Sequence, residues 1–227
     1  KFILSLIRAK FNAIFLGTTG MGIMSQILHT TTQFSNFTLL DMQHGLVKQI
    51  SSRKDNTKFQ DQLLNSLKSY IMIVFFVSII ISLLTLFFSE KLTVVLFGNI
   101  KYYKYYLICV VSFPILVVNS IPFALLKSFK NIKLIAKARL FSVVLSFIIF
   151  IPLVYYLQLI GAIITLVLTS ILTLIFNHIY AKKNILNNYS ISFSKILFKG
   201  RVIKKDLIEL FHFAGWGLTI GVYHLFT

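Results

Sequence analysis

The sequence predicts an all-α fold, a polytopic bundle of transmembrane helices. Apolar types make up 57% of the 227 residues, charged types only 13%, and the mean hydropathy is +0.83. A soluble domain averages about 25% charged residues, so too few charges are present to cover a globular surface. Uncharged stretches recur that reach the ~20 residues needed by a membrane helix. Basic residues outnumber acidic ones by 23 to 6 and stand between those stretches.

The uncharged stretches predict about six full spans and a truncated seventh. Gly17, Gly20 and Gly22 predict a tight turn between the first two spans. Residues 140–181 are too long for one span and suit two, with a turn near 158–161. The expected spans are residues up to about 17, about 22–50, 69–89, 105–126, the two parts of 140–181, and 207 onward.

Composition divides the chain into three expected parts. Residues 1–182 form an N-terminal six-helix transmembrane bundle, 183–206 a basic cytoplasmic linker, and 207–227 the truncated start of a second bundle. The chain begins with Lys1 rather than Met and stops inside an apolar stretch, so we expect it to be the first part of a longer protein.

The basic residues predict the orientation in the membrane. Residues 48–68 hold five Lys or Arg, 127–139 hold five and 182–205 hold seven, whereas the intervening loops hold only Lys91, Lys101 and Lys104. Cytoplasmic loops of membrane proteins carry such an excess. We therefore expect these three segments and the N-terminus to face the cytoplasm. Their placement between apolar runs also argues against nucleic-acid binding.

No catalytic or metal-binding motif stands out. Cys109 is the single cysteine, and the five histidines are scattered along the chain, so neither a catalytic set nor a metal site is expected. The glycines at 17, 20 and 22 lack the ending of a phosphate-binding loop.

Arg8 and Lys10 are the candidate substrate-binding residues. If Gly17 marks the outer end of the first helix, Arg8 lies about 13 Å deeper, near the middle of a ~30 Å hydrocarbon core. A charge at that depth normally faces a cavity or a partner, although snorkelling or pairing with an acid on another helix would also satisfy it. Lys10 lies about 200° around the helix from Arg8, so the two cannot point into one cavity.

Three further polar residues are candidates for ion coupling or for lining a polar cavity. Asp41 is the acid of the second expected helix, and its position ~28 Å below Gly22 favours an interfacial aspartate near Lys48 over a buried coupling acid. Gln26 and His29 lie within the same expected span, where most polar groups simply hydrogen-bond to other helices.

Several short motifs occur along the chain in a fixed order. They are Lys10 to Gln26 with its three glycines, His44 to Lys48, Leu96-Phe97-Gly98, Lys127 to Lys137, Ile151 to Tyr155, and Gly161-Ala162. In order and spacing these motifs resemble a known family, the Wzx-type O-antigen and polysaccharide flippases. The resemblance covers essentially the whole chain and departs from the family pattern at Thr18-Thr19 and at Asp41-Met42-Gln43.

The resemblance implies membership of the multidrug/oligosaccharidyl-lipid/polysaccharide exporter superfamily. Its members have two six-helix bundles around a cavity and work by alternating access. The implied activity is that of a transporter, not an enzyme, with no cofactor: it moves an undecaprenyl pyrophosphate-linked oligosaccharide across the bacterial cytoplasmic (inner) membrane for O-antigen, lipopolysaccharide or surface polysaccharide synthesis. Arg8 and Lys10 would contact the pyrophosphate. Membrane lipids and other polysaccharide assembly proteins are the further partners it implies.

Three alternatives stay open. A cation-coupled multidrug exporter of the same superfamily would need a buried acid, for which Asp41 is poorly placed. A membrane-embedded polysaccharide polymerase or glycosyltransferase would need a catalytic cluster in a large outer loop, and Glu90 is the only acid of these short loops. A non-catalytic scaffold would not require Arg8 at the middle of the membrane.

Overall fold

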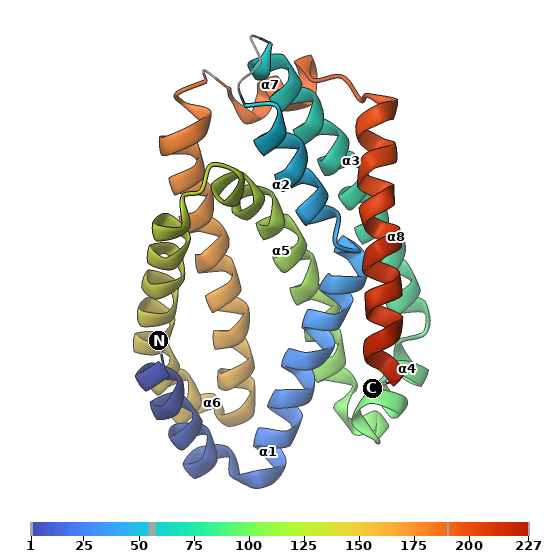
Figure 1. The fold of residues 1–227 in the computed structure, drawn as a ribbon. Helices are drawn as coiled ribbons and strands as arrows, with labels where there is room; N and C mark the ends of the chain where they lie inside the picture. Colours follow the sequence, from blue (N-terminus) through green and yellow to red (C-terminus); the bar gives the residue numbers. More distant parts are fainter. Residues whose placement is uncertain (1, 55–57, 190, 227) are drawn as a thin grey trace. The chain divides into compact units, whose positions relative to one another are not determined.

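A computed structural model describes residues 2–54, 58–189 and 191–226, and these residues form helices and no strand (Figure 1). The helices are α1 (Phe2–Leu39), α2 (Met42–Ser52), α3 (Phe59–Phe87), α4 (Ser89–Phe97), η1 (Ile100–Tyr102), α5 (Tyr103–Ser128), α6 (Ile132–Ala181), η2 (Lys182–Leu186), α7 (Phe193–Lys199) and α8 (Lys204–Phe226). The all-α prediction is therefore confirmed.

Four helical segments in the described part are long and apolar enough to cross a membrane: Leu6–Leu39, Phe59–Phe87, Ile100–Ser128 and Ile132–Leu186. The chain is thus a multi-pass membrane protein, as predicted. The expected count of six full spans plus a truncated seventh is corrected to these four. The expected first and second spans share α1, and the fifth and sixth share α6, because the chain turns within each helix without a separate loop. The expected seventh, α8, is not among the four.

The chain folds into two compact units, each assembled from three separate stretches. The first unit comprises Lys1–Ser35, Ile81–Leu116 and Ala136–Phe176, and the second comprises Asn36–Ile80, Val117–Ile135 and Asn177–Thr227. The sequential division into 1–182, 183–206 and 207–227 stays a prediction, and Lys1 and Thr227 lie outside the described residues.

In the first unit, α1 turns back on itself at Gly17. Gly17 has φ 64° and ψ −174°, a conformation that side-chain-bearing residues rarely adopt. The turn lets Asn12 reach Met24 across the hairpin, with 3.3 Å between Asn12 Nδ2 and Met24 Sδ. The turn predicted over 17–22 is present, but only Gly17 leaves helical geometry, and Gly20 and Gly22 continue the helix.

The second hairpin of this unit is α6, which reverses at Gln158, within the predicted range (Figure 1). Gln158 has φ 46° and ψ −122°. Three residues later, a Cβ on Gly161 would lie 2.0 Å from the Leu153 carbonyl oxygen, so only glycine allows this close approach. The rings of Phe141 and Phe176, one on each arm, lie 6.0 Å apart.

Two apolar clusters hold the first unit together. One contains Met24 of α1 with Phe150, Val154 and Ala162 of α6. The other joins α1, α5 and α6 through Ile27, Cys109 and Ile163. Because each cluster combines residues far apart in sequence, helix packing rather than local propensity fixes the positions of both hairpins.

In the second unit, the predicted long helix to about Ile50 is interrupted. Leu40 and Asp41 have positive φ values of 41° and 59°, so α1 ends at Leu39 and a separate helix, α2, begins at Met42. Aspartate tolerates the left-handed conformation better than most residues. Its carboxylate also forms a hydrogen bond with Nδ1 of His44 in the first turn of α2.

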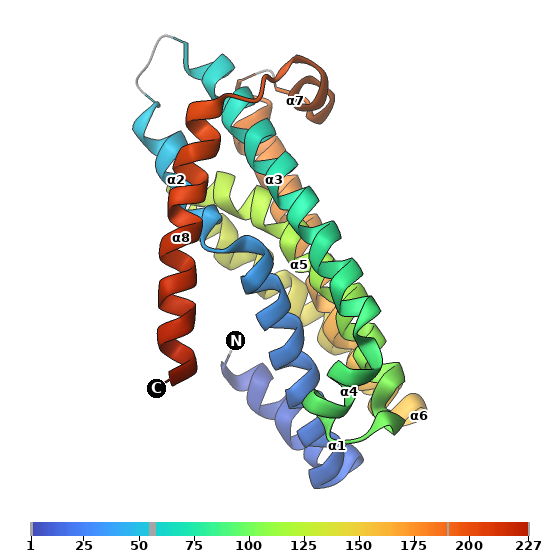
Figure 2. The ribbon, with the colours of Figure 1, turned by 90° about the vertical axis from the view of Figure 1, so that its right-hand side faces the viewer.

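The helices of the second unit are joined by polar and aromatic contacts. The Tyr70 hydroxyl lies 2.7 Å from the Ser120 hydroxyl, linking α3 and α5. Phe59, Phe129 and Tyr189, one from each basic segment or its border, form a ring cluster with centroid distances of 5.1 to 6.0 Å. The three basic segments therefore meet at this cluster, and the side of the membrane that they face stays a prediction. Figure 2 shows α2 and α8 side by side in this unit.

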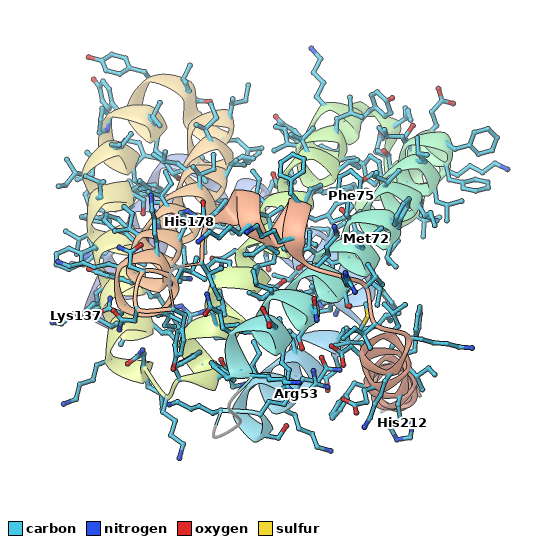
Figure 3. All side chains as sticks on the ribbon, turned by 90° about the horizontal axis from the view of Figure 1, so that it is seen from above. Arg53, Met72, Phe75, Lys137, His178 and His212 are labelled. Atoms are coloured by element: carbon cyan, nitrogen blue, oxygen red, sulfur yellow. The ribbon has the colours of Figure 1, made fainter. Side chains whose placement is uncertain are left out.

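Large apolar side chains remain exposed along the candidate spans. Met72 and Phe75 of α3, labelled in Figure 3, belong to this set, as do Phe87, Ile148 and Tyr156, the last 78% exposed. Soluble proteins rarely expose such extended apolar surface. A lipid environment would cover it, which agrees with the hydropathy of the sequence.

Candidate functional site

Arg8 of α1 is half-buried against α6 in the first unit. Its Nη2 donates a hydrogen bond to Ser146 Oγ at 3.3 Å, and its Cζ lies 5.0 Å from the centroid of the Phe150 ring. Ser146 and Phe150 are one helical turn apart, so both lie on the same face of α6. The guanidinium therefore has a hydroxyl and an aromatic face as neighbours.

No carboxylate among the described residues pairs with Arg8. The carboxylates of Asp206 and Glu209 pair with Arg53, and that of Asp41 contacts His44, all in the second unit. A long, weak contact with one hydroxyl does not neutralise a charge within a span. Among the described residues, the Arg8 guanidinium therefore has polar and aromatic neighbours but no anionic partner.

Lys10 lies two residues further along α1 and is exposed. The contrast with half-buried Arg8 agrees with the expected ~200° between them. The structure does not bring the two charged groups into one site, and a substrate role for either residue stays a prediction.

Asn12 was missed by sequence reasoning and lies one turn after Arg8 on the same helix. Its side chain is buried, and its Oδ1 has no hydrogen-bond partner among the residues that the structure describes. Its spacing of four from Arg8 was the available signal, because i and i+4 residues share a helix face.

The three other predicted residues are dispersed. Gln26 is half-buried and His29 is exposed, both on α1 in the first unit. Asp41 lies in the second unit, at the start of α2, in its hydrogen bond with His44. A role for any of the three in ion coupling or in a polar cavity remains a prediction.

A pocket of about 100 Å³ opens in the first unit between α1, α5 and α6. Its polar atoms are hydroxyls that donate to carbonyl groups of their own helices, as Thr31 does to Ile27 and Ser170 to Leu166. No charged side chain lines the pocket, so its chemistry suits hydrocarbon better than phosphate. Its lining residues are Ile27, Leu28, Thr31, Thr32, Ile108, Ser112, Leu116, Ile163, Leu166, Val167 and Ser170.

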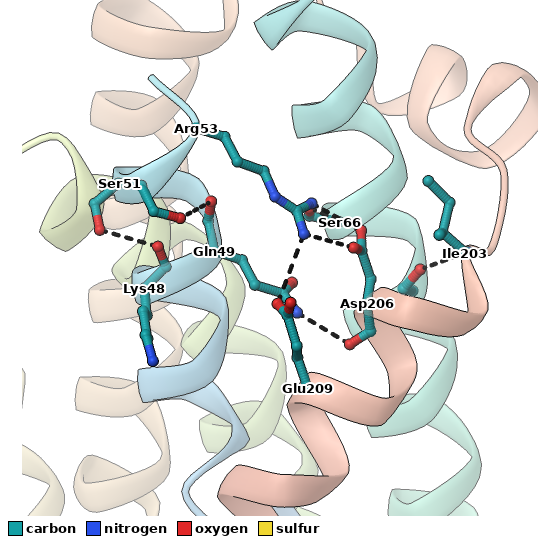
Figure 4. Close-up of polar contacts among 10 residues, drawn as sticks. Lys48, Gln49, Ser51, Arg53, Ser66, Ile203, Asp206 and Glu209 are labelled. Atoms are coloured by element: carbon teal, nitrogen blue, oxygen red, sulfur yellow. Dashed lines mark hydrogen bonds and ion pairs between the residues drawn. The ribbon is translucent and has the colours of Figure 1, made fainter. Parts of the chain in front are cut away.

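A second polar cluster, in the second unit, ties α8 to α2 and α3 (Figure 4). Arg53 binds Asp206 with both terminal nitrogens, at 2.7 and 3.0 Å, and also donates to Ser66 Oγ at 2.8 Å. Ser66 donates to Asp206 at 3.1 Å. The hydrogen bond to Asp206 raises the pKa of the Arg53 guanidinium above its ordinary value, so Arg53 stays charged.

Sequence reasoning missed this cluster, although one signal was present. Asp206 is the first acidic residue after a segment with seven basic residues and no acid. It is also buried, with a side chain only 2% exposed. Because every charged group in the cluster has a partner, the cluster holds helices together and leaves no group open to a ligand.

No three His, Cys, Asp or Glu side chains gather around one point within 2–54, 58–189 and 191–226. His178 of α6 and His212 of α8 are well separated in Figure 3, as their scattered positions in the sequence suggest.

Comparison with known proteins identifies the family. A family model described as polysaccharide biosynthesis protein matches residues 1–226. No curated protein and no solved structure matches the chain significantly. The match supports the resemblance at the level of the family and does not single out the Wzx-type members. The chain belongs to the polysaccharide biosynthesis protein family.

Proposed function

We propose that this protein is a flippase for a lipid-linked oligosaccharide. The substrate would be carried on undecaprenyl pyrophosphate and moved by alternating access across the bacterial cytoplasmic membrane, for O-antigen or other surface polysaccharide. The N-terminus and the three basic segments would face the cytoplasm. Family membership and the candidate membrane spans support a transport role in polysaccharide synthesis.

The observation that carries the proposal is the unpaired Arg8 within a candidate span. Placing a cation in the hydrocarbon core costs about 2.5–3.5 kcal/mol on insertion scales. A pyrophosphate would offset that cost, because guanidinium can donate two parallel hydrogen bonds to phosphate oxygens. The Ser146 hydroxyl is fully buried and donates to the Val143 carbonyl at 3.0 Å, so its oxygen can accept from Arg8 and help to position the guanidinium.

The Phe150 ring restrains the guanidinium without neutralising it. The ring is fully buried, so its place in the core is fixed, and Arg8 lies over its face. A cation–π contact leaves the N–H groups at the edge of the guanidinium available as donors. Exposed Lys10 would act at most as a second, outer phosphate contact.

Competing functions find less support in the described residues. A cation-coupled exporter needs a buried acid free to exchange ions, whereas Asp41 pairs with His44 and buried Asp206 pairs with Arg53. A polymerase or glycosyltransferase needs converging catalytic groups, and none of the clusters described above has that composition.

The test replaces Arg8 in the full-length protein. Arg8→Ala should abolish flipping of undecaprenyl pyrophosphate-linked oligosaccharide in proteoliposomes, and Arg8→Lys should keep part of the rate because a point charge remains. Lys10→Ala is the matched control, since it removes a cation two residues away on an exposed face. Membrane insertion and expression are compared by immunoblot.

Two results would contradict the proposal. Normal flipping and normal surface polysaccharide in Arg8→Ala would remove Arg8 from the substrate path. If the reconstituted protein transports drugs and does not flip the lipid, the result would favour the multidrug exporter.

A further inference from the structure

Asn12 has a side-chain oxygen that none of the described residues satisfies. It is 7% exposed, so water has little access to its carboxamide. Its Nδ2 faces only the thioether of Met24 at 3.3 Å, which is a weak acceptor, and its Oδ1 lacks a partner in the described part of the chain. Buried polar groups nearly always have a hydrogen-bond partner, and an exception calls for a specific reason.

Asn12 also lies beside the cationic site. Arg8 and Asn12 are four residues apart on one helical segment, which brings their Cβ atoms within about 5–6 Å of each other on one face. A chain of contacts also links the two residues. Arg8 lies over the Phe150 ring, and Phe150 packs in one cluster with Met24. The Met24 sulfur in turn contacts Asn12. A guanidinium and an unsatisfied carboxamide are therefore neighbours in one site.

We propose that Asn12 recognises the first sugar of the substrate, through the hydrogen-bonding group on the carbon next to the phosphate-bearing one. This inference rests on the proposed function, in which Arg8 holds the pyrophosphate. In a glycosyl phosphate, the substituent on C2 lies directly beside the phosphate. A C2 hydroxyl or acetamido N–H would donate to Asn12 Oδ1, and its oxygen would accept from Nδ2 in place of the Met24 sulfur.

This role accounts for the retention of an unfavourable group. Replacing a buried amide whose oxygen lacks a partner by an apolar side chain of similar shape removes an unsatisfied group, so the change is neutral or stabilising for the ligand-free fold. Asn12→Leu is therefore expected to keep or raise the thermal unfolding temperature of the ligand-free protein. The same substitution removes the partner of the sugar, so stability and recognition should change in opposite directions.

The experiment compares three probe lipids bound to the purified full-length protein in detergent. The first is undecaprenyl pyrophosphate without sugar, the second carries one N-acetylglucosamine, and the third carries 2-deoxyglucose, which lacks the C2 substituent. The natural protein should bind the second about 3- to 10-fold more tightly than the third, the size of one hydrogen bond. Asn12→Leu should abolish this preference while binding the sugar-free lipid normally.

Further variants separate this inference from the proposed function. Arg8→Ala should weaken the binding of all three lipids to a similar degree. Lys10→Ala should preserve the preference for the lipid that carries the C2 substituent. Suppose that Arg8→Ala weakens the binding of all three lipids. If the natural protein then shows no C2 preference, or if Asn12→Leu keeps that preference, only the role of Asn12 is overturned. If Arg8→Ala does not weaken the sugar-free lipid, the phosphate site fails and the inference fails with it. A marked fall in unfolding temperature for Asn12→Leu, with parallel losses for all three lipids, would make Asn12 structural and also overturn the inference.

Discussion

Asp206 offers the sharpest test of the second unit, because its carboxylate is the point where α2, α3 and α8 meet. We consider Asp206→Ala. The substitution removes two hydrogen bonds from Arg53 and one from Ser66, and it leaves the Arg53 guanidinium, 20% exposed, without its bidentate partner. The remaining ion pair of Arg53, with Glu209, is longer at 3.6 Å.

Removing one partner of a buried pair typically costs about 3–5 kcal/mol. Arg53 would be left mostly out of water with only the longer ion pair to Glu209, so the lower end of this range applies. We expect Asp206→Ala to lower the free energy of unfolding by about 3 kcal/mol. Asp206→Asn should cost less, about 2 kcal/mol, since the amide oxygen still accepts one hydrogen bond. The double variant Arg53→Met/Asp206→Leu should recover much of the loss, because it removes both charges together.

The assay is a denaturant titration of the purified protein in detergent micelles, with α8 docking followed separately. Lys48 Nζ lies 5.5 Å from the Phe213 ring, so cysteines at these two positions report contact between α2 and α8 through a flexible thiol-specific crosslinker that spans the two shortened side chains. Asp206→Ala should reduce the crosslinking yield. Cys109 is buried and should not interfere.

Glu209→Ala is the matched control. Glu209 lies on α8 with Asp206 and pairs with the same Arg53 guanidinium. Its side chain is 41% exposed, so its loss should lower the free energy of unfolding by less than about 1 kcal/mol. Equal costs for Asp206→Ala and Glu209→Ala, or an Asp206→Ala effect below about 0.5 kcal/mol, would refute the argument that burial makes this pair strong.

Three further predictions concern the hairpins and the topology. Gly161→Ala should destabilise the protein by at least about 1–3 kcal/mol in the same titration, because its Cβ would lie 2.0 Å from the Leu153 carbonyl oxygen; an unchanged midpoint would mean that the two arms of α6 are not so close. Gln158→Gly should stabilise by up to about 1 kcal/mol, since glycine adopts φ 46° without strain; a lower stability would count against a reversal at this residue. Reporter fusions after Lys58, Lys133 and Lys199 should report the cytoplasm and a fusion after Lys101 the outside; the opposite pattern would invert the topology.

Local composition was enough to predict the fold class and the two hairpin turns. Long uncharged stretches require helices in a membrane, because every backbone polar group must be satisfied within the segment. A stretch as long as 140–181 must then reverse, and the chain does so at Gln158. The first turn was predicted from its glycines, and Gly17 takes the positive φ that permits it.

Sequence reasoning failed where a boundary depends on packing. The sequence immediately around Leu40 and Asp41 has no glycine or proline that would predict a helix end. The break between α1 and α2 was therefore not predicted. The count of spans failed for a related reason, because hydropathy marks apolar length and does not reveal whether two arms are joined by a loop or by a turn inside one helix.

The sequence by itself determined that this is a multi-pass, all-α membrane protein whose basic segments alternate with apolar ones, and its motifs pointed to the polysaccharide biosynthesis family. Arg8 could also be singled out, because its depth follows from counting residues along one helix. Only the tertiary structure decided what surrounds each polar group: Ser146 and Phe150 beside Arg8, no partner for Asn12 Oδ1 among the described residues, and Asp206 against Arg53 across 153 positions. Periodicity and composition report on the helix that carries a residue, whereas the partners of a buried polar group lie on other helices, and their approach is set by the packing of the whole unit.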